Sequence, residues 1–225
     1  MNLPQISDFI NFHDHGSVHA DGVFTVDNIM VHENRTPGGE EGLTYSVGAH
    51  PWFITEQNLA EQLIRVREMA SSDNVFAIGE CGFDKLKGAP IELQKRSFES
   101  HFEIAEELGL PLIIHCVKAW PEIQEARKRL KPSTPWIIHG FKGKKELAQQ
   151  LTDKGFYLSA WVEWAIRPVS AETLNSMPLD NLFLETDGFD IGIEPVYKVV
   201  AGYLGITVED LKKQLFRNFM NVVNI

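Results

Sequence analysis

Short apolar runs that alternate with longer amphipathic stretches are the feature of this chain that most constrains its fold. Eight of these runs have the length of strands, and most are followed by a segment of helical length. The alternation is typical of a parallel sheet covered by helices, because strands buried on both faces are continuously apolar. We expect strands at residues 9–12, 24–31 in part, 44–47, 75–78, 111–114, 136–138, 156–159 and 182–184.

The segments between the runs predict the helices and the domain organisation. Gly109 and Gly155 stand where a glycine commonly ends a helix. Residues 16–43 offer one weak strand and no helix, so the first βα crossover is abridged. The pattern predicts an α/β protein with a TIM-like (β/α)8 barrel in a single domain, residues 1–225. Helices are expected at residues 56–71, 92–108, 121–130, 144–154, 171–176, 196–203 and 208–222.

Many of the apolar runs stop at a histidine or an acid. The C-terminal ends of the strands in a parallel barrel converge on one mouth, so these side chains are expected to meet there. His13 and His15 are separated by one residue and share a face of an extended strand. Glu185 and Asp187 also share a facing, and Asp187 lies nearer the mouth. The residues at these ends are His13, His15, His50, Glu80, His115, His139, Glu185 and Asp187.

The residue types at these strand ends indicate metal chemistry. Four imidazoles and two carboxylates, from His13, His15, His115, His139, Glu80 and Asp187, exceed the needs of one tetrahedral ion. They favour two divalent ions that share a carboxylate and supply a metal-bound hydroxide for hydrolysis. Nitrogen and oxygen donors without a thiolate do not distinguish Zn, Mn, Co, Ni and Mg.

Composition limits the partners. The formal net charge of −10 argues against a broad basic face that holds duplex nucleic acid. No apolar stretch approaches the roughly 18 to 20 residues of a membrane span, and no secretory signal is recognisable, so a cytoplasmic location is expected. Cys81 and Cys116 are too few for a disulfide framework and are interpreted as core residues.

The order and spacing of several blocks resemble those of the TatD family of metal-dependent deoxyribonucleases, within the amidohydrolase-like TIM-barrel superfamily. The resemblance extends over nearly the whole chain. The blocks are NFHDHG at 11–16, VGAHPW at 47–52, AIGECGFD at 77–84, Gln94, LPLIIHC at 110–116, IIHGFKGK at 137–144, GFYLSA at 155–160 and LFLETD at 182–187.

The resemblance implies roles for individual residues. One metal ion would be held by His13, His15 and Asp187. His115 and His139 would hold a second, and Glu80 would bridge the two. Asp187 would also accept a proton from the attacking water. Five further residues would line or support the cleft: His50, Asp84, Lys118, Phe141 and Gly143.

Three departures from the family pattern affect the site. Asn11 stands where the family usually has an Asp that would orient the first histidine. Lys118 stands near the position of an Arg able to grip phosphate in a bidentate manner, which a lysine cannot do. The sequence GFDIGI after Asp187 and the shortened first crossover also alter the mouth.

Three functions are compatible with these features. The first is a phosphodiesterase or deoxyribonuclease acting on DNA ends or short single-stranded DNA. The second is a hydrolase of amide, ester or lactone bonds in a small molecule, which the loss of the Arg favours. The third is a non-enzymatic binding barrel, indicated only by Asn11. His19, His32 and His101 are interpreted as surface or packing residues, and Trp161 and Trp164 as candidates for stacking against a ligand.

Overall fold

The computed structural model describes residues 2–223, which fall into two compact units. Unit 1 comprises residues 28–39 and 45–138. Unit 2 comprises residues 2–27, 40–44 and those from 139 onward. β2, β3 and β6, defined below, each contribute residues to both units.

Eight strands form one sheet in which they pair in chain order, from β1 to β8. The pairings of β1 with β2, β3 with β4, β4 with β5, β5 with β6 and β7 with β8 are parallel. This confirms the predicted α/β class and the TIM-like (β/α)8 fold. The strands are β1 (Phe9–Asp14), β2 (Val23–Met30), β3 (Leu43–Gly48), β4 (Val75–Asp84), β5 (Leu112–Val117), β6 (Trp136–Phe141), β7 (Phe156–Trp161) and β8 (Leu182–Glu185).

The helices follow the strands from β3 onward. No helix lies between β1 and β3 among residues 2–223, so the predicted abridgement affects two connections rather than the first alone. The short α5 and the two 3-10 turns were not predicted, because three or four residues carry no helical period. The helices are α1 (Leu59–Ala70), α2 (Ile91–Leu108), α3 (Trp120–Leu130), α4 (Lys145–Thr152), α5 (Val162–Ala165), η1 (Pro168–Ser170), α6 (Ala171–Ser176), η2 (Leu179–Asn181), α7 (Ile193–Leu204) and α8 (Val208–Val222).

The two glycines predicted to end helices differ in their outcome. Gly109 is the C-cap of α2, with a left-handed φ of 67°, as expected. The C-cap of α4 is instead Asp153 in a right-handed conformation, and Gly155 follows it at a φ of 79°. Gly155 therefore turns the chain toward β7 rather than capping α4.

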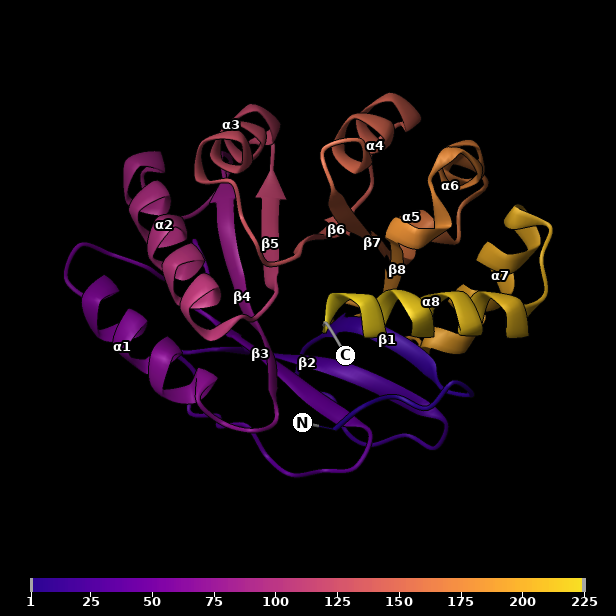
Figure 1. The fold of residues 1–225 in the computed structure, drawn as a ribbon, viewed down its shortest axis with the longest axis horizontal. Helices are drawn as coiled ribbons and strands as arrows, with labels where there is room; N and C mark the ends of the chain where they lie inside the picture. The colour runs from indigo at the N-terminus through magenta and orange to yellow at the C-terminus, as the bar shows by residue number, and fades with distance from the viewer. Residues whose placement is uncertain (1, 224–225) are drawn as a thin grey trace. The chain divides into compact units, whose positions relative to one another are not determined.

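In unit 1, α2 packs along β4 and buries one apolar face there (Figure 1). Phe98 of α2 lies 5.0 Å from the ring of Phe83 and 5.3 Å from that of Trp136, measured between centroids. These aromatic contacts anchor α2 on two strands and so fix the positions of the side chains that β4 carries.

In unit 2, β1 lies beside β8 and is covered by α7 and α8 (Figure 1). The ring of Phe12 stacks on Phe183 at 3.9 Å and contacts Phe219 of α8 at 6.4 Å. The buried hydroxyl of Tyr197 accepts a hydrogen bond from the Ile10 N–H and donates one to the Ile10 carbonyl. Burial raises the pKa of Tyr197, which stays protonated and ties α7 to β1.

Several strands continue beyond the apolar runs that predicted them. β4 was expected to end at residue 78 but extends to Asp84, and its last residues pair with β5. Glu80 therefore lies inside a strand rather than at its end. Gly79 and Glu80 lie where the register with β5 shifts, and the pairing resumes from Cys81 to Asp84, because main-chain pairing does not depend on side-chain polarity.

Gly82 makes the close approach of β4 to β5 feasible. Its φ is 143°, and a Cβ atom there would lie 2.1 Å from the carbonyl oxygen of His115. No side chain fits at that distance, so the second glycine of the block AIGECGFD is required for packing against β5.

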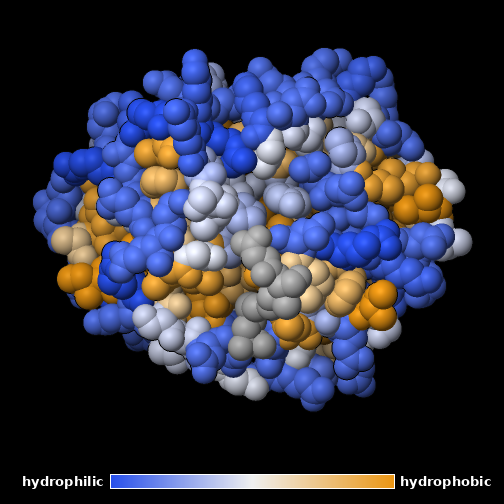
Figure 2. Space-filling view, in the orientation of Figure 1, coloured by the Kyte–Doolittle hydropathy of each residue, from blue (hydrophilic) through white to orange (hydrophobic). Residues whose placement is uncertain are grey.

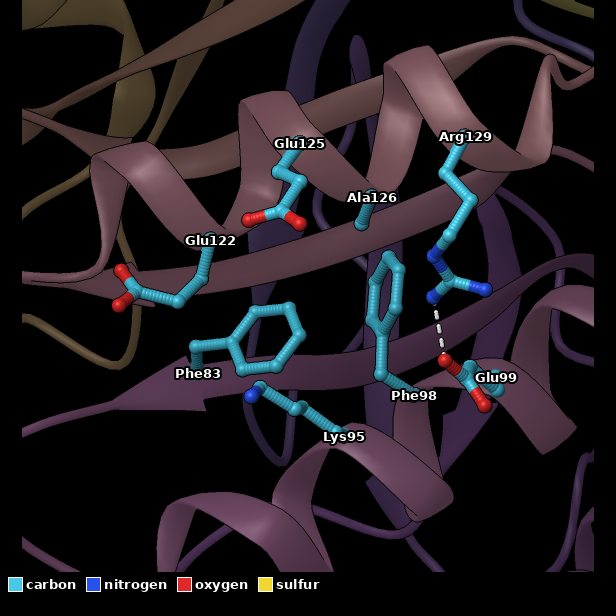
Figure 3. Close-up of a pocket in the computed structure, with 8 residues that line it drawn as sticks. All are labelled: Phe83, Lys95, Phe98, Glu99, Glu122, Glu125, Ala126 and Arg129. Atoms are coloured by element: carbon cyan, nitrogen blue, oxygen red, sulfur yellow. Dashed lines mark hydrogen bonds and ion pairs between the residues drawn. The ribbon is translucent and has the colours of Figure 1, made fainter.

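The outer faces of the helices are mostly hydrophilic on the side drawn in Figure 2. One surface pocket of about 300 Å³ lies between α2 and α3 of unit 1 (Figure 3). Arg129 pairs with Glu99 across it, and none of its residues belongs to the predicted site. Within residues 2–223, no helix is long and apolar enough to cross a membrane. A cytoplasmic location and a single domain remain predictions.

Candidate metal-binding site

The end of β1 and the segment after β8 bring together three residues expected to bind one metal. The Nε2 atoms of His13 and His15 lie 3.7 and 3.4 Å from Oδ1 of Asp187. His13 is buried, whereas about a quarter of each of the other two side chains is exposed. The candidate ligand atoms lie within 4.8 Å of one another. The trio thus combines a buried donor with two that solvent can reach.

Three consecutive N–H groups after β8 are held by the end of β1. Thr186 N–H donates to Asn11 Oδ1 at 3.0 Å, and Asp187 N–H donates to the His13 carbonyl oxygen at 3.0 Å. Gly188 N–H donates to Asp14 Oδ1 at 2.6 Å. Asp187 adopts a φ of 52°, in the left-handed region that favours glycine. These three bonds hold that conformation.

Asn11 has a different role from the one expected for this position. Its side-chain amide donates to Thr186 Oγ1 at 2.7 Å and to Asp14 Oδ2 at 3.3 Å. The resemblance implied that a residue at this position would orient His13. The side chain of Asn11 instead forms hydrogen bonds with Thr186 and Asp14. An amide suits this position because it can donate to the Asp14 carboxylate while accepting from a main-chain N–H.

Asp14 was missed by sequence reasoning. Its two carboxylate oxygens accept from Gly188 N–H, from Ser17 Oγ at 2.9 Å and from Asn11. The side chain joins the end of β1 to the loop that carries Asp187. The only signal in the sequence was its position between His13 and His15, where alternation turns it away from them.

His139, within β6, lies with Glu185 in the same unit. His139 Nδ1 is 3.6 Å from Glu185 Oε1, which also accepts from Gly140 N–H at 2.6 Å. The imidazole rings of His139 and His13 are 4.2 Å apart between centroids. Glu185 is fully buried, and its Oε2 has no hydrogen-bond partner among residues 2–223. Such a carboxylate can orient the imidazole and raise its basicity as a ligand.

Unit 1 contains a second cluster, formed by His50, Glu80 and His115. Glu80 Oε1 lies 3.1 Å from His50 Nε2 and 2.7 Å from His115 Nδ1. All three residues are buried. Asn28 fixes the backbone beneath them, because its Oδ1 accepts from Glu80 N–H and from Ser46 Oγ, both at 2.9 Å. His50, expected only to line the cleft, has the position of a ligand in this cluster.

Asp84 lies at the end of β4, against the other side of His115. Its Oδ2 is 3.1 Å from His115 Nε2 and accepts from the indole N–H of Trp52 at 2.7 Å. Burial alone would raise the pKa of Asp84, but hydrogen bonds from Trp52, from the N–H groups of Leu86 and Lys87 and from His115 lower it overall. Asp84 is therefore an anionic partner that orients His115.

His101 supports this cluster from α2. The ring is buried, with Nδ1 2.7 Å from the Ser97 carbonyl oxygen, while Nε2 accepts from Ala49 N–H at 2.9 Å. Burial lowers its pKa to about 4. The neutral imidazole fixes the backbone immediately before His50, in line with the packing role expected for it.

The remaining predicted residues have mainly packing or surface positions. Phe141 is buried and packs on Trp164, and a Cβ atom at Gly143 would lie 2.7 Å from its ring. Lys118 is exposed, with a left-handed φ of 56°. Lys142 Nζ lies over the Trp161 ring, 4.1 Å from its centroid. Stacking of a ligand on Trp161 or Trp164 stays a prediction.

Comparison with known proteins identifies the family. The model for TatD related DNase matches residues 35–224. The chain belongs to the TatD family. It is 28% identical over 214 residues to the uncharacterized metal-dependent hydrolase YcfH of Escherichia coli, covering 87% of this chain and 79% of that protein. It is 32% identical over 160 residues to a protein of Cronobacter sakazakii named 3'-5' ssDNA/RNA exonuclease TatD, covering 65% of this chain and 57% of that one.

Solved structures of TatD proteins share the fold. YjjV, a TatD homologue from Escherichia coli, superposes with a TM-score of 0.78 at 20% identity, covering 98% of this chain and 100% of that one. A TatD family hydrolase from Entamoeba histolytica gives a TM-score of 0.75 at 16% identity, covering 98% and 99% of the two chains. The TatD-family chain is thus a metal-dependent hydrolase on a TIM-like barrel.

The donor atoms of this TatD-family chain suit a divalent metal. Each cluster offers imidazole nitrogens and a carboxylate, a set that Zn and other divalent transition metals accept. Thiolate ligands are disfavoured, because burial raises the pKa of Cys81 well above its usual value and that of Cys116 to about 12. Both cysteines are free thiols; Cys81 is buried, as expected for a core residue, whereas Cys116 is only half-buried.

Proposed function

We propose that this TatD-family hydrolase is a phosphodiesterase that acts on the ends of DNA or on short single-stranded DNA. The observation that carries the proposal is the pair of His-carboxylate clusters, one in each unit, built only from nitrogen and oxygen donors. The name of the Cronobacter relative, an exonuclease on single-stranded DNA and RNA, adds support for the substrate class.

His13, His15 and Asp187 would hold one metal ion, and His115 would hold a second. Glu80 as their shared ligand and His139 as a ligand of the second ion stay predictions. His50 joins the candidate ligands because its Nε2 lies 3.1 Å from Glu80 Oε1. Divalent ions in such a site activate water and polarise a phosphoryl oxygen.

Asp187 would take the proton released when water attacks the phosphorus. Its side chain is 27% exposed, so water reaches it, and His15 is 3.4 Å away. The hydrogen bonds from residues 186–188 to β1 hold its backbone before substrate arrives. A base held in place in this way needs little reorganisation during the reaction, so the energetic cost of positioning it is low.

An end of a strand is the substrate that suits this charge distribution. The net charge of −10 repels the long run of phosphates in a duplex, whereas a strand end needs only a small cationic centre.

A second function, hydrolysis of an amide, ester or lactone, is favoured by one observation. Lys118 is exposed and cannot grip a phosphate in the bidentate manner of an arginine. The same ligands could serve attack on a carbonyl carbon, so the bond cleaved must be decided by experiment.

The experiment is an assay of metal-free protein reloaded separately with Zn, Mn, Co, Ni and Mg. Substrates are end-labelled single-stranded DNA, para-nitrophenyl acetate and a simple lactone. We expect chelator-sensitive shortening of the DNA from one end, lost in Glu80→Gln and Asp187→Asn but kept in Glu122→Gln, which alters only the pairing with Lys85. Hydrolysis of the ester or lactone with intact DNA under every metal would support the second function instead.

A further inference from the structure

A pocket of about 360 Å³ lies beside the His13, His15 and Asp187 trio, entirely within unit 2. His15 is part of its wall, together with Asn11 and Asp14. The rest is built mainly by two segments, residues 16–20 after β1 and residues 188–193 after Asp187. These are the shortened crossover and the GFDIGI sequence, the two parts of the mouth where this chain departs from the family pattern.

Six apolar side chains line the pocket, beside seven polar or charged ones. Val18 is 82% exposed and Phe189 is 47% exposed, and Ala20, Val23 and Ile191 also contribute. Phe189 is presented by a tight turn, in which its N–H donates to the Thr186 carbonyl and its own carbonyl accepts from Ile191 N–H at 2.7 Å. Exposed apolar groups beside a polar metal site mark a surface that a ligand covers.

The charges of the pocket exclude a second phosphate as that ligand. No lysine or arginine lines it, whereas two carboxylates do, those of Asp14 and Asp190. The oxygens of Asp14 already accept from Gly188, Ser17 and Asn11. A phosphate would meet negative charge without a compensating cation, so the chemistry fits an uncharged flat ring.

We propose that this pocket binds the nucleobase of the nucleotide that is released, with Phe189 stacked on the base. The inference rests on the proposed phosphodiesterase function and specifies its substrate. The volume lies at the lower end of the roughly 300 to 1,000 Å³ typical of small-molecule sites, enough for one base. Stacking on an aromatic ring tolerates every base, so the pocket selects for a nucleoside rather than for a sequence.

The position of the pocket beside His15 explains why a strand end is the substrate. A base seated there belongs to the nucleotide whose phosphate lies at the trio. The absence of any cation in its wall gives a continuing strand no place for its next phosphate. The protein would therefore remove terminal nucleotides and prefer diesters that carry a base.

The test compares two diesters with the same leaving group, thymidine 5'-(para-nitrophenyl phosphate) and methyl para-nitrophenyl phosphate. We expect kcat/KM of the metal-loaded protein to favour the thymidine ester by about tenfold or more. In Phe189→Ala the ratio of the two values falls by about tenfold, and in Phe189→Tyr it is largely restored. Val169→Ala, which truncates an exposed apolar side chain in η1 that does not line the pocket, is the control and keeps the wild-type ratio.

A thymidine titration of the metal-free protein, followed by NMR, makes the result independent of catalysis. Binding that weakens in Phe189→Ala but not in Val169→Ala supports the pocket. Hydrolysis of both esters with an equal ratio in wild type and Phe189→Ala overturns the pocket and leaves the phosphodiesterase intact. Failure to hydrolyse either ester overturns the phosphodiesterase, and the titration then decides the pocket: no thymidine binding overturns it as well.

Discussion

The backbone N–H of Asp187 donates to the carbonyl oxygen of His13 at 3.0 Å. Two residues expected to bind the same metal ion, one from β1 and one from the segment after β8, are thus joined through their main chains. The bond holds Asp187 in a left-handed conformation with a φ of 52°. The separation of these two donors is therefore set by the fold and not by the metal.

Replacement of Asp187 by glycine should separate stability from activity. Glycine removes the steric strain of the left-handed conformation but raises the conformational entropy of the unfolded chain. These effects oppose each other, so we expect the free energy of unfolding to change by no more than about 1 kcal/mol. Loss of the carboxylate should lower kcat by at least about 100-fold. Lys131→Gly, at the left-handed C-cap of α3, is the control. We expect it to change the stability by a similar amount and to leave the activity intact. An active Asp187→Gly protein would remove Asp187 from the mechanism.

Restoring the family's carboxylate at position 11 should destabilise this chain. Asn11→Asp loses both side-chain donor bonds and brings a second carboxylate within about 3.3 Å of Asp14 Oδ2. We expect a loss of roughly 2 to 4 kcal/mol at pH 7 in denaturant unfolding of the metal-free protein. Repulsion raises the pKa of the new carboxyl, so the deficit should shrink as the pH falls and the group is protonated.

Asn34→Asp is the control for that substitution. Asn34 is exposed, so a carboxylate at this position stays hydrated and should leave the stability nearly unchanged. A deficit at Asn34 as large as at Asn11, or a deficit at Asn11 that does not depend on pH, would contradict the role assigned to Asn11.

Gly82→Ala tests the close approach of β4 to β5. The new Cβ would lie 2.1 Å from the His115 carbonyl oxygen, a main-chain atom that cannot move cheaply. We expect a destabilisation of roughly 3 kcal/mol or more, since strain and overpacking add. Gly109→Ala, also at a positive φ but with no atom within 4 Å, should cost only about 1 kcal/mol. Equal losses in thermal unfolding would show that backbone conformation alone matters at Gly82.

The pKa of His101 predicts a pH-dependent stability. Its folded pKa of about 4 lies below the ordinary 6.5, so the unfolded chain binds the proton more tightly. Stability should therefore fall as the pH drops from about 6.5 to 4, by roughly 3 kcal/mol from this residue. In His101→Gln, which keeps an acceptor for Ala49 N–H, that component of the unfolding curve should disappear. Parallel pH curves for both proteins would refute it.

Most strands of the barrel were predictable because they contain a buried apolar run, although β2 and β3 also bury polar residues. The ends of the strands were not, and β4 shows why. After Ile78 its residues are no longer an apolar run, yet Cys81 to Asp84 pair with β5. Apolar patterning reports burial, whereas a strand ends where main-chain pairing ends.

For the candidate ligands too, the sequence predicted some features of the site and missed others. The sequence pointed to His13, His15 and Asp187 because each follows an apolar run, and the fold brings them together in unit 2. It gave no reason to place His50 against Glu80, or Asn11 against Thr186. Those pairings depend on side-chain directions that no linear spacing reports.

The sequence by itself determined the class of the protein: the alternation of runs predicts the (β/α)8 fold, and the residue types near the strand ends predict nitrogen and oxygen donors for a metal. Only the tertiary structure decided which side chains support those ligands. Asp14, Asn11 and Glu185 act through hydrogen bonds to residues distant in the chain, with no period and no fixed spacing. Burial patterns are local and repeat along the sequence, whereas hydrogen-bond partners are chosen by contact in space.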